Sequence, residues 1–146
     1  MTTYTSTRKI AAPVNLVFDT VSQITNFSEA IPQIVNVEFL SEQKSGLGTR
    51  FKETRLMNGR EATTELEVTE FVPNERIRLV SDAGGTIWDT VFTVQPAGDQ
   101  VELDMVMNAS AYKFTSRIMN IFIKGFVQRA LEQDMDAVKE YCEQKN

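Results

Sequence analysis

Histidine is absent from the 146 residues. That absence excludes Ser-His and Cys-His nucleophile pairs, histidine proton shuttles and most zinc sites. Cysteine occurs once, at Cys142, so no internal disulfide can form and a disulfide-stapled secreted scaffold is excluded. The acidic residues are spread along predicted strands, where alternating exposure explains them. We therefore expect no metal site and no cofactor.

Long apolar runs are also missing. No stretch approaches the ~20 residues of a membrane span. The first residues, MTTYTSTRKI, lack the apolar core of a signal peptide. We expect a soluble, cytoplasmic protein with no stable membrane insertion.

Basic residues are fewer than acidic ones, 15 against 20, which gives a net charge of −5. A domain of that sign repels phosphate backbones, so nucleic-acid binding is not expected. An anionic membrane surface is disfavoured for the same reason, unless a local basic patch overrides the total. The length is that of about one domain, and we expect residues 1–146 to form it.

Most of the chain alternates polar and apolar residues with a period of two, the pattern of half-buried strands. Asn58-Gly59 is a strong signal for a two-residue hairpin, and Gly- or Pro-containing stretches separate the other runs. Strands are predicted at 2–10, 34–39, 49–57, 60–72, 76–81, 86–94 and 101–109.

Helical spacing occurs in three places. Val14, Val17, Phe18 and Val21 follow Pro13 at intervals of three and four, and a second short helix is predicted for Asn26 to Ala30, before Pro32. The third and longest helix ends the chain. A sheet with one apolar face needs a cover, which the last helix supplies. The predicted fold is α+β: a curved seven-stranded antiparallel sheet, two short helices after its first strand, and a long C-terminal helix across it.

Three stretches resemble a known superfamily: IAAPVNLVFDTVSQITNFSEAIPQIVNVEFL from Ile10, GLGTRFKET from Gly46, and EVTEFVPNERIRLVS from Glu67. They are similar to SRPBCC proteins, the START-like and Bet v 1-like helix-grip proteins that include polyketide cyclase and coenzyme-Q-binding relatives. The resemblance spans almost the whole chain. Many relatives carry a tryptophan near the end of the second helix, where this chain reads Phe27 to Ile31, so no subfamily is assigned.

The resemblance implies a cavity between the sheet and the C-terminal helix. Members bind lipids, sterols, quinones, plant hormones or polyketides there, and some catalyse cyclisation or dehydration. These are properties of individual members, and the fold alone selects none of them.

Residues 117–131, RIMNIFIKGFVQRAL, carry more apolar side chains than one helix face can hide. One stripe leads to the C-terminus and predicts the contact with the sheet: Val127, Leu131, Met135, Val138 and Cys142. Ile118, Phe122 and Phe126 fall ~100° or more from that stripe, with Met119 and Ile123 between. Three alternatives are open for these surplus apolar side chains. The preceding loop and the short helices bury them, or they line or gate a cavity, or they form a dimer or partner surface.

Two further features of this helix allow more than one interpretation. Gly125 lowers helix stability relative to alanine, which suggests a bend or a close backbone approach. Lys113, Arg117, Lys124 and Arg129 are most simply a solvated face, but they could help to contact an anionic partner.

Candidate ligand contacts come from the predicted inner face of the sheet and from the helix surplus. Methionine and aromatic side chains suit adaptable binding surfaces, although each could equally be ordinary core. If Phe51 points inward, alternation puts Glu53 and Arg55 on the same face, where the fork of Arg55 would suit a carboxylate ligand. The candidates are Phe39, Phe51, Glu53, Arg55, Met57, Leu79, Trp88, Phe92, Met105, Met107, Met119, Phe122, Ile123 and Phe126.

Three functions fit these observations. The first is a binding or carrier protein for a hydrophobic or amphipathic small molecule such as a lipid, a quinone or a polyketide-like compound. The second is an enzyme of the polyketide cyclase or dehydratase kind, which the absence of histidine disfavours without excluding. The third is a protein-interaction module that uses the apolar face of the C-terminal helix, for which a homodimer is one form.

Overall fold

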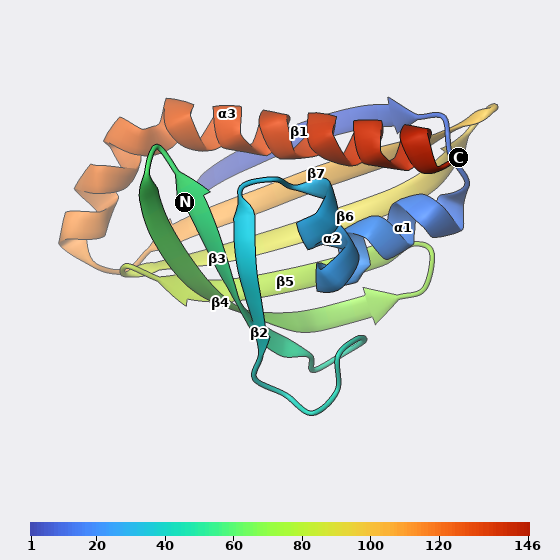
Figure 1. Ribbon diagram of the computed structural model, residues 1–146. Coiled ribbons are helices and arrows are strands. Elements are labelled where there is room, and N and C mark those ends of the chain that lie inside the picture. The colour runs from blue at the N-terminus through green and yellow to red at the C-terminus, as the bar shows by residue number, and fades with distance from the viewer.

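Seven antiparallel strands form one sheet in the computed structural model, which describes residues 1–146 (Figure 1). Three helices accompany them: α1 and α2 follow the first strand, and α3 ends the chain. The elements are β1 (Thr2–Ile10), α1 (Val14–Ser22), α2 (Ile24–Ala30), β2 (Ile34–Phe39), β3 (Arg50–Met57), β4 (Arg60–Val72), β5 (Arg76–Ala83), β6 (Thr86–Ala97), β7 (Gln100–Ala111) and α3 (Phe114–Lys145).

The strand order in the sheet is β1-β7-β6-β5-β4-β3-β2. Strands β2 to β7 form a meander in which each strand pairs with the next, and β1 closes beside β7 with Thr2 opposite Ala109 and Ile10 opposite Val101. The curved sheet wraps around α3, with α1 and α2 beside one end of that helix (Figure 1). This is the helix-grip arrangement, and the predicted fold is confirmed.

Tight turns join the long strands where the sequence contains glycine. Asn58 and Gly59 have φ of 53° and 77°, the left-handed values of a type I′ hairpin turn. At the β5–β6 turn, a Cβ on Gly85 would come within 2.9 Å of the Lys113 Cβ. Only glycine therefore allows the start of α3 to approach this turn so closely.

Several boundaries differ from the predicted ones. Strands β5 and β6 run to Ala83 and Ala97, beyond the predicted ends at 81 and 94, because Gly84-Gly85 and Gly98-Asp99 alone make the turns. Pro96 is tolerated in β6 because the pairing of β5 with β6 ends at Thr93. Around Pro96, strand β6 is therefore paired on one side only. Helix α2 begins at Ile24, two residues before its predicted start.

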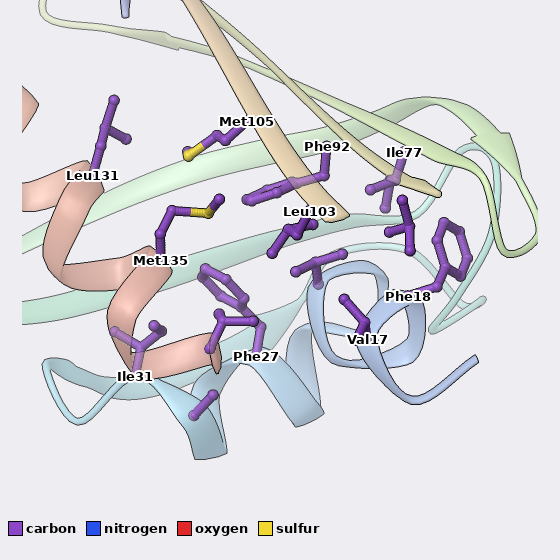
Figure 2. Packing of buried hydrophobic residues seen from close by; sticks show 14 of the residues in the cluster. Val17, Phe18, Phe27, Ile31, Ile77, Phe92, Leu103, Met105, Leu131 and Met135 are labelled. Carbon is purple, nitrogen blue, oxygen red and sulfur yellow. The ribbon is translucent and has the colours of Figure 1, made fainter. Parts of the chain in front are cut away.

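The core fills the end of the molecule that α1 and α2 cover (Figure 2). Phe18 packs edge-on against Phe71, with ring centroids 5.4 Å apart, and Phe27 packs against Phe92 at 6.1 Å. Figure 2 shows Met135 of α3 in the same cluster. This end of the space between the sheet and α3 is thus filled by protein side chains.

The C-terminal half of α3 is buried along the predicted stripe. Leu131, Met135, Val138 and Cys142 are all buried, so Cys142 is a core residue. Val127 packs against the same core while keeping some exposure. This part of the prediction is confirmed.

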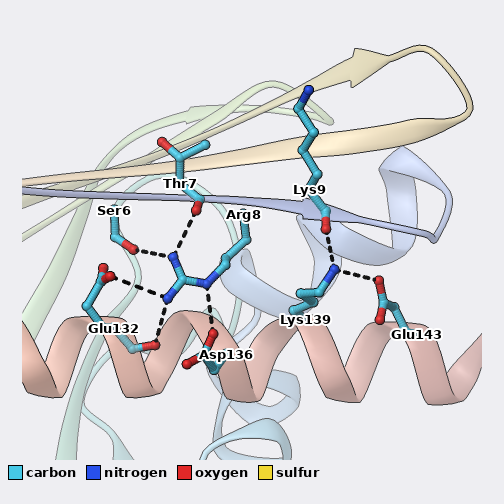
Figure 3. Close-up of polar contacts among 8 residues, drawn as sticks. All are labelled: Ser6, Thr7, Arg8, Lys9, Glu132, Asp136, Lys139 and Glu143. Carbon is cyan, nitrogen blue, oxygen red and sulfur yellow. Dashed lines mark hydrogen bonds and ion pairs between the residues drawn. The ribbon is translucent and has the colours of Figure 1, made fainter.

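Polar contacts fasten the C-terminal half of α3 to β1 (Figure 3). Arg8 Nε donates to Asp136 Oδ1 at 2.8 Å, and Nη2 of the same guanidinium pairs with Glu132. Further along, Lys139 Nζ donates to the carbonyl oxygen of Lys9 at 2.6 Å. These contacts hold the helix over one edge of the sheet.

The N-terminal half of α3 leaves its apolar side chains in solvent. Phe114, Ile118, Met119, Ile121 and Phe122 are all exposed, and Phe122 keeps 80% of its surface accessible. The expectation that loops and short helices bury this surplus is therefore wrong. Neither short helix reaches it, because α1 and α2 lie beside the opposite end of α3 (Figure 1).

The first turns of α3 lie at an angle to the rest of the helix (Figure 1). A Cβ on Gly125 would meet only the guanidinium end of Arg129, at 3.6 Å. Gly125 is therefore not needed for a close approach, which leaves a bend as the remaining alternative for this glycine.

Candidate functional site

A pocket of about 310 Å³ lies between the sheet and α3, directly beside the core, and several core residues form part of its lining. Its walls come from β3 to β7, from the α1–α2 corner and from the middle of α3. Of its 23 lining residues, 16 are hydrophobic, so its surface is mostly apolar with a few polar groups. Neither β1 nor β2 contributes a side chain to the lining.

Strand alternation explains which side chains reach the pocket. Every second residue of β3 lines it, from Phe51 to Met57, and Thr90 stands between Trp88 and Phe92 on β6. Asp89, on the opposite face, pairs with Arg78. Ten of the sequence candidates line the pocket: Phe51, Glu53, Arg55, Met57, Leu79, Trp88, Phe92, Met105, Met107 and Phe126.

Four candidates lie elsewhere. Phe39, at the end of β2, packs against the rim of the core with Lys44 Nζ 5.6 Å from its ring centroid. Met119, Phe122 and Ile123 belong to the N-terminal half of α3 and do not line the pocket. Helical spacing placed them near the cavity, but the bend in α3 and the end of the sheet leave them outside it.

The charged part of the lining is a cluster of Glu53, Arg55 and Asp134. Arg55 Nε donates to Glu53 Oε1, and Arg55 Nη1 lies 3.0 Å from the Asp134 carboxylate. Glu53 and Asp134 keep only 11% and 13% of their side-chain surface accessible. Three charges therefore stand within a mostly apolar wall, with two carboxylates around one guanidinium.

Burial raises the pKa of Asp134, and the neighbouring Arg55 charge offsets that rise only in part. For Arg55, burial acts to lower the pKa, but the Glu53 and Asp134 carboxylates outweigh it and raise the pKa above its usual value. The guanidinium is thus permanently charged, and burial favours the protonated form of Asp134 relative to a free aspartic acid.

The fork of Arg55, which the sequence suggested for a carboxylate ligand, is occupied by side chains of the protein itself. Its Nε and Nη1 are already engaged by Glu53 and Asp134, and a ligand carboxylate would be the third anion around one cation. Arg55 Nη2 is the one guanidinium nitrogen with no intramolecular partner, and it can donate to a single acceptor.

Sequence reasoning missed several lining residues. Asp134 is 79 positions from Arg55, and no local pattern in the sequence indicates that the two side chains meet. Ser22 is buried, and its hydroxyl has no hydrogen-bond partner. Alternation with Trp88 could have indicated Thr90. The missed lining residues are Val21, Ser22, Ile24, Phe27, Thr64, Leu66, Ser81, Ala83, Thr90, Val127, Ala130, Leu131 and Asp134.

Phe126 marks the opening of the pocket. It is the most exposed of the lining residues, with 41% of its surface accessible. Its neighbours in the lining, Val127 and Ala130, are half-buried. The pocket therefore opens beside the middle of α3, next to the exposed N-terminal half of that helix.

Residues 1–143 match the model of a family described as polyketide cyclase / dehydrase and lipid transport. The chain belongs to this family. The SRPBCC resemblance is confirmed, because a match of that length leaves only the last three residues uncovered. No curated protein sequence is similar enough to match the chain.

Solved structures with the same fold differ widely from this polyketide cyclase / dehydrase family member in sequence. A START superfamily protein from Mycobacterium smegmatis has a TM-score of 0.80 at 15% identity, covering 99% of each chain. The di-domain ARO/CYC StfQ of the steffimycin biosynthetic pathway has a TM-score of 0.81 at 12% identity, covering 98% of this chain and 51% of its own. Ara h 8.0201 has a TM-score of 0.76 at 11% identity, covering 97% of each chain.

None of the helices is both long and apolar enough to cross a membrane. In α3, the longest, charged residues interrupt the apolar ones along the whole helix, basic in its N-terminal half and of both signs in its C-terminal half.

Proposed function

We propose that this protein binds a hydrophobic or amphipathic small molecule in the pocket between the sheet and α3, as a binding or carrier protein. The supporting observation is a mostly apolar pocket of about 310 Å³ with one charged cluster in its wall. Ligand sites generally combine apolar walls with a few placed polar groups, and they start at about this volume. The family description, which includes lipid transport, agrees with this function.

The charged cluster restricts the polar end of the ligand. Glu53 and Asp134 accept hydrogen bonds, and Arg55 Nη2 donates one, so a neutral group that can do both fits best. A hydroxyl or a phenol meets that condition, and a ketone satisfies the Arg55 donor alone. An ionised carboxylate would add a third anion to a desolvated site. The proposed ligand is therefore an apolar molecule that ends in a neutral oxygen group.

A cyclase or dehydratase is the second candidate function, and Asp134 favours it. A buried carboxyl group whose pKa is raised holds its proton to higher pH than a free one does, and it can pass that proton to a substrate oxygen. Arg55 would then stabilise the developing negative charge. Asp134→Asn should abolish turnover of a β-hydroxyketone while leaving its binding intact, and unchanged turnover would exclude this role.

Native mass spectrometry tests the binding function. The protein should retain an apolar compound after purification, or take one up from a panel of fatty alcohols, quinones and polyketide-like phenols. Thr90→Phe places a phenyl ring in the pocket and should abolish uptake. Val91→Phe is the matched control, because Val91 does not line the pocket, and it should bind normally. A clean apo mass together with no uptake from the panel would overturn the proposal.

A pair of ligands of equal length tests the polar end. At pH 8, 1-decanol should bind at least about tenfold more tightly than decanoate, because only the second must bury a charge beside two carboxylates. Tighter binding of decanoate would still agree with a ligand in the pocket. It would refute the proposal that the charged cluster selects a neutral polar end.

A further inference from the structure

The N-terminal half of α3 has its polar and apolar sides inverted relative to a packed helix. Ser116 Oγ donates to the carbonyl oxygen of Gly84, and Asn120 Nδ2 donates to Thr86 Oγ1 at 3.1 Å, so polar side chains face the sheet. Two residues further along a helix is ~200° around its axis. Ile118 and Phe122 accordingly point into solvent.

Charge in the same segment is of one sign. Residues 112–131 contain four basic side chains and no Asp or Glu, in a chain whose net charge is −5. The four are Lys113, Arg117, Lys124 and Arg129, and none of them forms an ion pair. This is the local basic patch that can override the negative total.

We propose that this segment docks the protein on an anionic lipid surface. The α3 docking surface consists of the exposed apolar residues and the basic residues beside them: Phe114, Ile118, Ile121, Phe122, Lys113, Arg117 and Lys124. Helices that lie in a membrane interface combine an apolar face with lysine and arginine in this way. Docking of this kind does not require the helix to span the bilayer.

A second copy of the chain is a poorer occupant of the same surface. A two-fold symmetric contact would place each basic patch against its own copy, since such interfaces are self-complementary. Repulsion between Arg117 and Lys124 of the two copies would oppose that association. An anionic lipid surface offers charge complementarity and an apolar phase together.

The α3 docking surface is continuous with the mouth of the pocket. Phe126 lines the pocket and is one helical turn from Phe122. A membrane-bound molecule would therefore have the pocket opening close to the lipid. Docking does not rest on the proposed function, because its determinants are surface residues outside the lining.

Flotation with vesicles tests the inference. The intact protein should float with phosphatidylcholine vesicles that contain 30% phosphatidylglycerol and should not float with pure phosphatidylcholine. Binding should fall in high salt, because screening weakens contacts between exposed charges. Thr90→Phe should float normally, so that loss of the pocket and loss of docking are distinguishable.

Matched variants locate the surface. Phe122→Ser should reduce vesicle binding at least about tenfold, since it removes a large apolar side chain from the interface. Leu47→Ser, which changes another exposed apolar residue in the β2–β3 loop, should have no effect. The pair Arg117→Gln and Lys124→Gln should weaken binding by about fivefold per charge. Lys52→Gln with Arg60→Gln, which are exposed on β3 and β4, is the control.

Two results would overturn the inference. Equal binding to neutral and anionic vesicles would show that the basic residues take no part. Absence of vesicle binding, with light scattering that shows a dimer which Phe122→Ser dissociates, would assign the surface to self-association. Circular dichroism of each variant checks that the fold is intact, as expected for a residue as exposed as Phe122.

Discussion

Arg55 Nη1 lies 3.0 Å from the carboxylate of Asp134, which joins β3 to α3 at the wall of the pocket. The same guanidinium donates to Glu53, two residues before it on the strand. One cation therefore holds two poorly solvated carboxylates in place. The position of α3 therefore determines whether Asp134 reaches Arg55 in the wall of the pocket.

Removing this cation should destabilise the fold strongly. Arg55→Met leaves Glu53 and Asp134 facing each other without a partner, and unfolding in urea should show a loss of about 3 kcal/mol. Arg76→Met is the control, because Arg76 and its partner Glu70 are much more exposed, and its loss should be far smaller. Similar losses for the two variants would mean that the cluster is well solvated.

Because the pKa of Asp134 is raised, its contribution to the stability of the fold should change with pH in the opposite direction to that of an ordinary ion-paired carboxylate. The folded state holds the Asp134 proton to higher pH than the unfolded state does, so this proton stabilises the fold. The stability of the protein relative to Asp134→Asn should fall as pH rises through the folded pKa, beginning above the unfolded value of about 3.9. Urea midpoints between pH 3 and 8 measure it.

Glu143 provides the comparison of opposite sign. The backbone N–H of Ala11 and then the Lys139 ammonium lower its pKa, so its contribution exists above the unfolded pKa and disappears as pH falls. The loss of stability caused by Glu143→Gln should therefore vanish in acid. The stability of the unmodified protein relative to Asp134→Asn should instead increase in acid. A difference for Asp134→Asn that follows the Glu143 pattern would mean that Arg55 outweighs burial at Asp134.

The hydroxyl of Tyr4 is buried without a hydrogen-bond partner. Tyr4→Phe should leave stability unchanged or raise it by up to about 1 kcal/mol, because it removes a desolvated polar group. In Tyr141 the hydroxyl donates to Glu29 at 2.7 Å, so Tyr141→Phe should lower stability instead. Thermal unfolding of both variants decides the matter, and a marked loss for Tyr4→Phe would show that its hydroxyl has a partner in solution.

Cys142 should report global unfolding. Its side chain is fully buried against Thr20, and burial raises the pKa of the thiol, so little reactive thiolate is present at neutral pH. Labelling with iodoacetamide, followed by mass, should be slow in buffer and should rise steeply across the urea transition. Rapid labelling in buffer would mean that the C-terminal end of α3 opens without global unfolding.

Local rules were sufficient for most of the fold. The period of two placed the strands, and Asn58-Gly59 fixed a hairpin, because both depend on backbone geometry within a few residues. When short turns join consecutive strands, each strand pairs with the next, so a meander is the simplest strand order. The inward set on β3 followed from alternation alone, which is why Glu53 and Arg55 were found together.

Alternation failed where the register shifts. A bulge between Ile34 and Asn36 puts Ile34 in the core and leaves Val35 exposed. The extra residue of a bulge moves the side chains before it to the other face, and a short run of apolar residues does not reveal it.

The sequence by itself determined the strands, the helix stripe from Val127 to Cys142 and the lack of histidine chemistry. Only the tertiary structure decided that Asp134 meets Arg55 and that Phe122 stays in water. Helical spacing gives the angle of a side chain around its own axis. It does not say where the sheet ends or which distant strand lies opposite, because those depend on contacts between segments far apart in the chain.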